Sequence, residues 1–95
     1  GRERQVDAVM AERKMLKVSV ISPEATLFEG EASSVTAPAF DGEVGILPMH
    51  APMVTTLGAG VLRIGDGTAR FSVAGGFLQV VDDVVRVVTE KASRL

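Results

Sequence analysis

Apolar and polar residues alternate along most of the chain from Met15 onward. Over residues 16–20, Leu and Val alternate with Lys and Ser, and Pro23 follows. This period of two predicts a strand with one face toward a core and one toward water. Similar patterns predict further strands at residues 26–29, 31–37, 44–47, 53–57, 61–64, 68–74, 76–81 and 84–89.

Glycine, proline and aspartate mark the connections between these strands. Gly65-Asp66-Gly67 predicts one hairpin and Asp82-Asp83 another, while Gly30 is expected to be a bend or bulge. Short strands at this spacing predict an all-β fold: a two-sheet β-sandwich, or flattened barrel, of about ten short strands.

Valine occupies every position of residues 80–88 except those of Asp82, Asp83 and Arg86. Two explanations fit equally well. Either a loop covers the outer face of these strands, or that face contacts another protein, since an exposed valine stripe favours association.

The segment Val44–Leu62 has no charged residue over nineteen positions, close to the length of a membrane-spanning helix. Three glycines and two prolines interrupt it, together with His50. The segment is therefore interpreted as two short strands and a loop.

The first fourteen residues differ from the rest, because they carry seven charges. They are interpreted as a tag remnant or an N-terminal extension, with a short docking helix as the alternative. Residues 15–95 are expected to form the single domain.

Charge and composition exclude several classes of function. Ten basic residues against twelve acidic ones give a net charge of −2, and four Phe are the only aromatic residues. Nucleic acid is therefore not an expected partner. The chain has no cysteine and one histidine, so we expect neither a metal site nor a cofactor.

His50 could in principle act as a general base, as in a small β-fold enzyme. Thr55, Thr56 and Asp41 do not stand at a catalytic spacing from it. The glycine pairs 58/60 and 65/67 lack the third glycine of a phosphate-binding loop. No catalytic residue is therefore assigned.

A loop with two prolines is the most distinctive local feature. Pro48 and Pro52 fix the backbone on either side of Met49, His50 and Ala51. Such a stiff loop loses little entropy on binding and suits a partner contact. The prolines could equally well only end strands.

Three ordered segments resemble the epsilon subunit of F-type ATP synthase. Residues 41–64 read DGEVGILPMHAPMVTTLGAGVLRI, residues 16–32 read LKVSVISPEATLFEGEA, and residues 75–90 read GGFLQVVDDVVRVVTE. The resemblance covers residues 15–90. It implies the N-terminal β-sandwich of that family, with two five-stranded sheets.

The resemblance also implies a function and partners. The domain would be a non-catalytic rotor subunit of the central stalk that links the gamma subunit to the polar loops of the c-ring and supports coupling of proton flow to ATP synthesis. The implied location is peripheral, on the cytoplasmic face of the bacterial inner membrane, with an organelle membrane less favoured. The implied contact residues are Glu43, Pro48, Met49, His50, Ala51 and Pro52.

The helical hairpin that follows the sandwich in typical members is absent from this sequence, either because the sequence ends at the domain boundary or because the protein lacks the hairpin. An inhibitory role is therefore not assigned. The alternative function is a free-standing β-sandwich module that binds a protein through the same loop.

Overall fold

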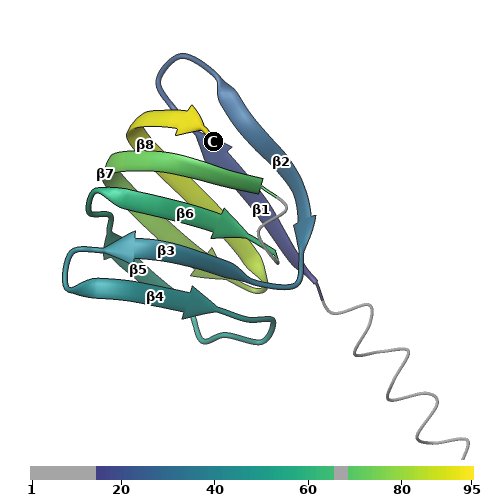
Figure 1. The fold of residues 1–95 in the computed structure, drawn as a ribbon. Helices are drawn as coiled ribbons and strands as arrows, with labels where there is room; N and C mark the ends of the chain where they lie inside the picture. The colour runs from purple at the N-terminus through teal and green to yellow at the C-terminus, as the bar shows by residue number, and fades with distance from the viewer. Residues whose placement is uncertain (1–14, 66–68) are drawn as a thin grey trace, which may run out of the picture.

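The computed structural model describes residues 15–65 and 69–95, and over these residues the chain forms eight β-strands (Figure 1). The strands are β1 (Leu16–Ile21), β2 (Thr26–Ala32), β3 (Val35–Ala39), β4 (Gly42–Ile46), β5 (Met53–Thr56), β6 (Gly60–Ile64), β7 (Ala69–Val81) and β8 (Val84–Arg94). No helix in the described part of the chain is long and apolar enough to cross a membrane.

The strands pack as two layers, and the two longest strands contribute to both. The first layer runs in the order β2, β1, β8, β7, β5 and uses residues 84–88 of β8 and 77–81 of β7. The second layer runs β8, β7, β6, β3, β4 and uses residues 91–94 and 69–74 of the same two strands. Figure 1 shows β7, β6, β3 and β4 side by side at the front. Among the strands of the described residues, β1 and β8 alone pair in parallel.

The core lies between the inner faces of the layers. The largest fully buried side chains are those of Phe71, Leu16, Ile46, Leu62, Ile64, Leu78, Val18, Val20, Val35, Val80, Val85 and Val87. Each such side chain contributes about 1.5–3 kcal/mol relative to exposure in water. The aromatic ring of Phe28 on β2 meets that of Phe71 on β7 edge-on, with centroids 6.4 Å apart. This contact joins the two layers at the side where β2 has no neighbouring strand.

The bend of β7 depends on two consecutive glycines. Gly75 and Gly76 have φ angles of 78° and 103°, which residues with a side chain rarely adopt. A Cβ on Gly76 would clash with the carbonyl oxygen of Val88 and lie 2.7 Å from the Cα of Thr89 on β8. Backbone approach this close requires glycine, so the β7–β8 pair can turn from one layer into the other.

The predicted all-β sandwich is confirmed, while residues 15–65 and 69–95 form eight strands instead of about ten. Residues 68–74 and 76–81 were predicted as two strands, but β7 continues through the glycine bend and stays paired with β8 on both sides of it. Because β7 and β8 each supply a segment to both layers, the layers still contain five strand segments each. The sheet does not close into a barrel, since β2 and β4 pair on one side only.

Two strand boundaries were also predicted wrongly. β2 runs straight through Gly30, which pairs with Val18, and the break comes instead at Ser33 and Ser34. β8 continues to Arg94 and not to Thr89, because residues 91–94 pair with the first half of β7. In the sequence alone, a glycine inside a strand and a charged stretch at its end both resemble the end of a strand, because the strand that pairs with them is not known.

Two predictions concern residues outside the described ones. The proposed leader at residues 1–14 lies there, as does most of the turn Gly65-Asp66-Gly67. The antiparallel pairing of Ile64 with Ala69 places β6 and β7 as neighbours on either side of that turn.

The valine run has an inner and an outer face. Val80, Val85 and Val87 are fully buried, whereas Val81 and Val84 are 40% and 42% exposed. The explanation in which a loop covers the outer face is therefore wrong for these two residues.

Candidate functional site

The proline loop, residues 47–52, connects β4 in the second layer to β5 in the first. His50 N donates a hydrogen bond to Leu47 O at 3.2 Å, which closes a turn with Pro48 and Met49 at its centre. Met49 has a φ angle of 72°. Proline followed by a residue with positive φ is the pattern of a type II turn, although glycine usually fills the second position.

The tip of the proline loop is apolar and open to solvent. Leu47 is 63% exposed and Met49 69% exposed. Ala51 and Pro52 are also exposed, whereas Pro48 and His50 are half-buried. Large apolar side chains at a stiff, exposed tip are suited to contact with another protein.

The turn between β7 and β8 is hydrogen-bonded to the proline loop. The backbone N–H of Met49 donates to Oδ1 of Asp83 over 2.6 Å. Asp82 and Asp83 have φ angles of 50° and 63°, typical of the tight hairpin turn predicted from the sequence. The contact between the turn and the loop was not predicted, because Asp82-Asp83 was considered only as a turn signal.

Glu43 lies apart from the other five predicted contact residues. It is on β4, four residues before Leu47, which is about 14 Å along an extended strand. Its Oε2 accepts a hydrogen bond from Nη2 of Arg63 on β6 at 3.0 Å, across the intervening strand β3. The two side chains are 57% and 49% exposed, so the ion pair contributes only about 0–1 kcal/mol to stability.

The environment of His50 offers no catalytic arrangement. Its Nδ1 lies 2.7 Å from the carbonyl oxygen of Ala51, which accepts a hydrogen bond when Nδ1 carries the proton. The Thr55 hydroxyl donates to the carbonyl of Thr56 instead of meeting the imidazole. Among the described residues, no three His, Asp or Glu side chains gather where a metal ion could bind.

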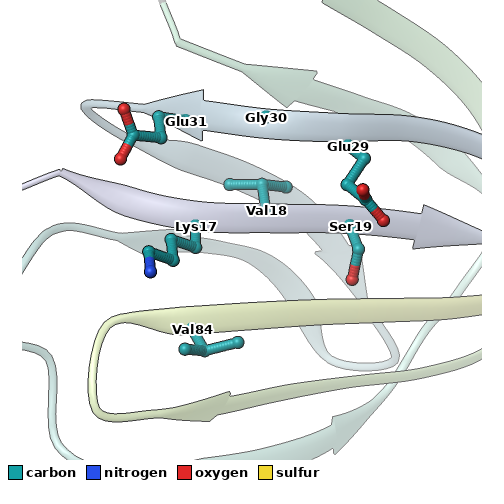
Figure 2. Close-up of a pocket in the computed structure, with 7 residues that line it drawn as sticks. All are labelled: Lys17, Val18, Ser19, Glu29, Gly30, Glu31 and Val84. Atoms are coloured by element: carbon teal, nitrogen blue, oxygen red, sulfur yellow. The ribbon is translucent and has the colours of Figure 1, made fainter.

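The outer face of the first layer carries a hollow of about 410 Å³. Figure 2 shows its lining: Lys17, Val18 and Ser19 from β1, Glu29, Gly30 and Glu31 from β2, and Val84 from β8. A second hollow is lined by Gln79, Val81, Asp82, Val84 and Arg86, so the two share Val84. The outer face of the first layer is thus apolar at Val81 and Val84, while its β2 edge carries Glu29 and, opposite Lys17 on β1, Glu31.

Comparison with known proteins identifies the family. The family model "ATP synthase, Delta/Epsilon chain, beta-sandwich domain" matches residues 15–95. The ATP synthase epsilon chain of Leptospira borgpetersenii is 51% identical over 77 residues, covering 79% of this chain and 61% of that protein. The chain belongs to the ATP synthase delta/epsilon family, through its β-sandwich domain.

Other epsilon chains match over a similar length at lower identity. The epsilon chain of Desulforamulus reducens is 42% identical over 83 residues, covering 85% of this chain and 63% of its own length. The chain therefore spans less than two thirds of the length of these curated relatives.

Solved structures of ATP synthase contain the same fold. A chain in the Euglena gracilis mitochondrial ATP synthase, in a structure of OSCP, F1 and the c-ring, has a TM-score of 0.78 at 23% identity, covering 85% of this chain and 54% of its own. A chain in the central stalk and c-ring structure from Tetrahymena thermophila has a TM-score of 0.72 at 17% identity, covering 82% and 65%. At these identities the likeness is one of fold.

Proposed function

We propose that this epsilon-family domain is a non-catalytic rotor adaptor in the central stalk of a proton-translocating ATP synthase. It contacts the gamma subunit on one side and the polar loops of the c-ring on the other, and supports the coupling of proton flow to ATP synthesis. It performs no reaction and binds no cofactor. Its location is peripheral, held at the cytoplasmic face of a bacterial inner membrane through the complex.

The observation that carries this proposal is the exposed proline loop in a domain of this family. The loop presents Leu47 and Met49 to solvent while two prolines and a bond to Asp83 restrict its backbone. A restricted apolar tip loses little conformational entropy on binding, so it suits a contact that must persist while the partners rotate. Glu43 adds a carboxylate that could meet a basic group on a c-ring loop, at the cost of its contact with Arg63.

Co-purification tests the proposal. The tagged chain is expressed in cells of a related bacterium, membranes are solubilised in a mild detergent, and the bound subunits are identified by mass spectrometry. Recovery of the gamma and c subunits is expected. Their reproducible absence, while another set of proteins is retained through the proline loop, would favour a free-standing binding module instead.

A companion experiment addresses catalysis at His50. The purified parent chain and its His50→Ala variant are assayed as isolated chains for hydrolysis of ATP and of an activated ester. Neither chain is expected to catalyse either reaction, because Nδ1 of the imidazole lies 2.7 Å from the Ala51 carbonyl oxygen and the Thr55 hydroxyl donates to the Thr56 carbonyl instead of meeting the imidazole. A reaction catalysed by the isolated chain and lost in His50→Ala would contradict the proposal.

A further inference from the structure

We propose that Asp83 is a positioning residue that holds the proline loop in the conformation its partner binds. The inference rests on the proposed function, since it assumes that residues 47–52 are the docking element. It assigns to the β7–β8 turn a role beyond that of a connection between strands.

Asp83 links three segments that are distant in the sequence. Its side-chain Oδ1 accepts the N–H of Met49 at 2.6 Å, and its carbonyl oxygen accepts the N–H of Lys17 at 2.8 Å. The proline loop is thereby connected to the start of β1 through a single residue. Because β1 and β8 are central in the first layer, the loop is anchored to the rigid part of the molecule.

The backbone of the loop tip benefits from this acceptor. The hydrogen bond that closes the turn is donated by the N–H of His50, and Pro48 has no N–H. The N–H of Met49 is therefore the backbone donor at the tip that does not take part in closing the turn. Met49 also has a φ angle that disfavours a residue with a side chain. A carboxylate acceptor at 2.6 Å favours this conformation over extended alternatives.

The same bond sets the position of the loop relative to the apolar surface beside it. Val81 and Val84 flank the Asp82-Asp83 turn and are 40% and 42% exposed. With Asp83 bound to Met49, the loop that carries the exposed side chains of Leu47 and Met49 is held at the turn that Val81 and Val84 flank. A partner that contacts both regions then meets one preformed surface.

Substitutions in the β7–β8 turn distinguish the loss of the carboxylate acceptor from a change in the conformation of the turn. Asp83→Gly removes the carboxylate, and glycine accepts positive φ freely; Asp83→Asn keeps an acceptor oxygen and also tolerates positive φ. Asp82→Gly is the matched control, because Asp82 is in the same turn at a φ of 50° and the Met49 N–H bonds to its neighbour.

Amide hydrogen exchange of Met49 in the free 95-residue chain is the first measurement. Asp83→Gly is expected to exchange about tenfold faster than the parent chain, the effect of losing one hydrogen bond to a charged acceptor. Asp83→Asn and Asp82→Gly are expected to stay within about threefold of the parent chain. Equal exchange in Asp83→Gly and Asp82→Gly overturns the inference.

Titration against the purified gamma and c-ring assembly is the second measurement. Asp83→Gly is expected to bind about tenfold more weakly, with Asp83→Asn restoring most of the affinity. Unchanged affinity in Asp83→Gly, or an equal loss in Asp82→Gly, overturns the inference. If the parent chain itself does not bind, the proposed function fails, while the exchange data still decide whether Asp83 orders the loop.

Discussion

Single side chains in this domain differ in what they contribute, and burial decides most of the difference. Val87 and Val84 are close in sequence on β8, yet Val87 is fully buried and Val84 is 42% exposed. One valine is part of the core and the other is part of the surface beside the proline loop.

We expect Val87→Asp to abolish folding or assembly, because the carboxylate would be buried without a partner, at a cost of several kcal/mol. The matched variant Val84→Asp should remain folded. Circular dichroism and thermal melts of both variants test the prediction. A cooperative melt for Val87→Asp near that of the parent chain would contradict it.

The ion pair between Glu43 and Arg63 is exposed to solvent, so we expect it to contribute little to the stability of the fold. Glu43→Gln should lower the free energy of unfolding by less than about 1 kcal/mol, since both partners are half-exposed. Urea denaturation measures this, with Arg63→Gln as the matched control from the other side of the pair. A loss above about 2 kcal/mol in either variant would show that the pair matters for folding.

At the level of elements, the β7–β8 pair determines how the layers connect. Gly76→Ala should destabilise the domain by about 3 kcal/mol or more, because the new methyl group meets the β8 backbone and φ is unfavourable. Gly45→Ala on β4 is the control, since a Cβ there meets nothing within 4 Å. Chemical denaturation measures the free energy of unfolding of both variants. Equal values would refute the conclusion that the bend in β7 requires glycine at position 76.

The proline loop is the second element that a substitution can test. Pro48→Gly should keep the sandwich folded and lower affinity for the gamma and c-ring assembly, because the freed loop loses more entropy on binding. Ser33→Gly, in the exposed turn between β2 and β3, controls for the general effect of adding a glycine. Equal affinities of the two variants in a calorimetric titration would count against a docking role.

Much of this element pattern follows from the sequence, and the exceptions have physical causes. Alternation predicted β1 well, since its inner residues are buried at every second position. The continuity of β2 through Gly30 and of β7 through Gly75 depends on pairing with Val18 and with β8, which alternation does not report.

The candidate site was predictable only within the loop itself. Its prolines mark it in the sequence, but the bond from Met49 to Asp83 joins residues 34 positions apart. The pairing of Glu43 with Arg63 likewise depends on β3 lying between β4 and β6. Local sequence carries no signal for either contact.

At the scale of the whole molecule, the sandwich is open on the side where β2 ends the first layer. Phe28 packs there against Phe71, and the guanidinium of Arg94 lies 5.6 Å from the centroid of the Phe71 ring. These contacts cover the core where no strand pairing does.

We expect Phe28→Ala to lower the free energy of unfolding by about 2 kcal/mol, less than for a fully buried phenylalanine because Phe28 is only half-buried. Phe40→Ala should have almost no effect, since Phe40 is 76% exposed. Thermal denaturation of the two variants measures the difference. Equal melting temperatures of the two variants would mean that the contact between Phe28 and Phe71 does not stabilise the open side of the sandwich.

The shared hairpin also limits how the molecule can deform. Because β7 and β8 run without interruption through both layers, sliding one layer over the other would require breaking backbone hydrogen bonds as well as side-chain packing. A twisting force applied to one layer is therefore transmitted to the other through covalent chain. That shear stiffness would serve the rotor role proposed for this domain.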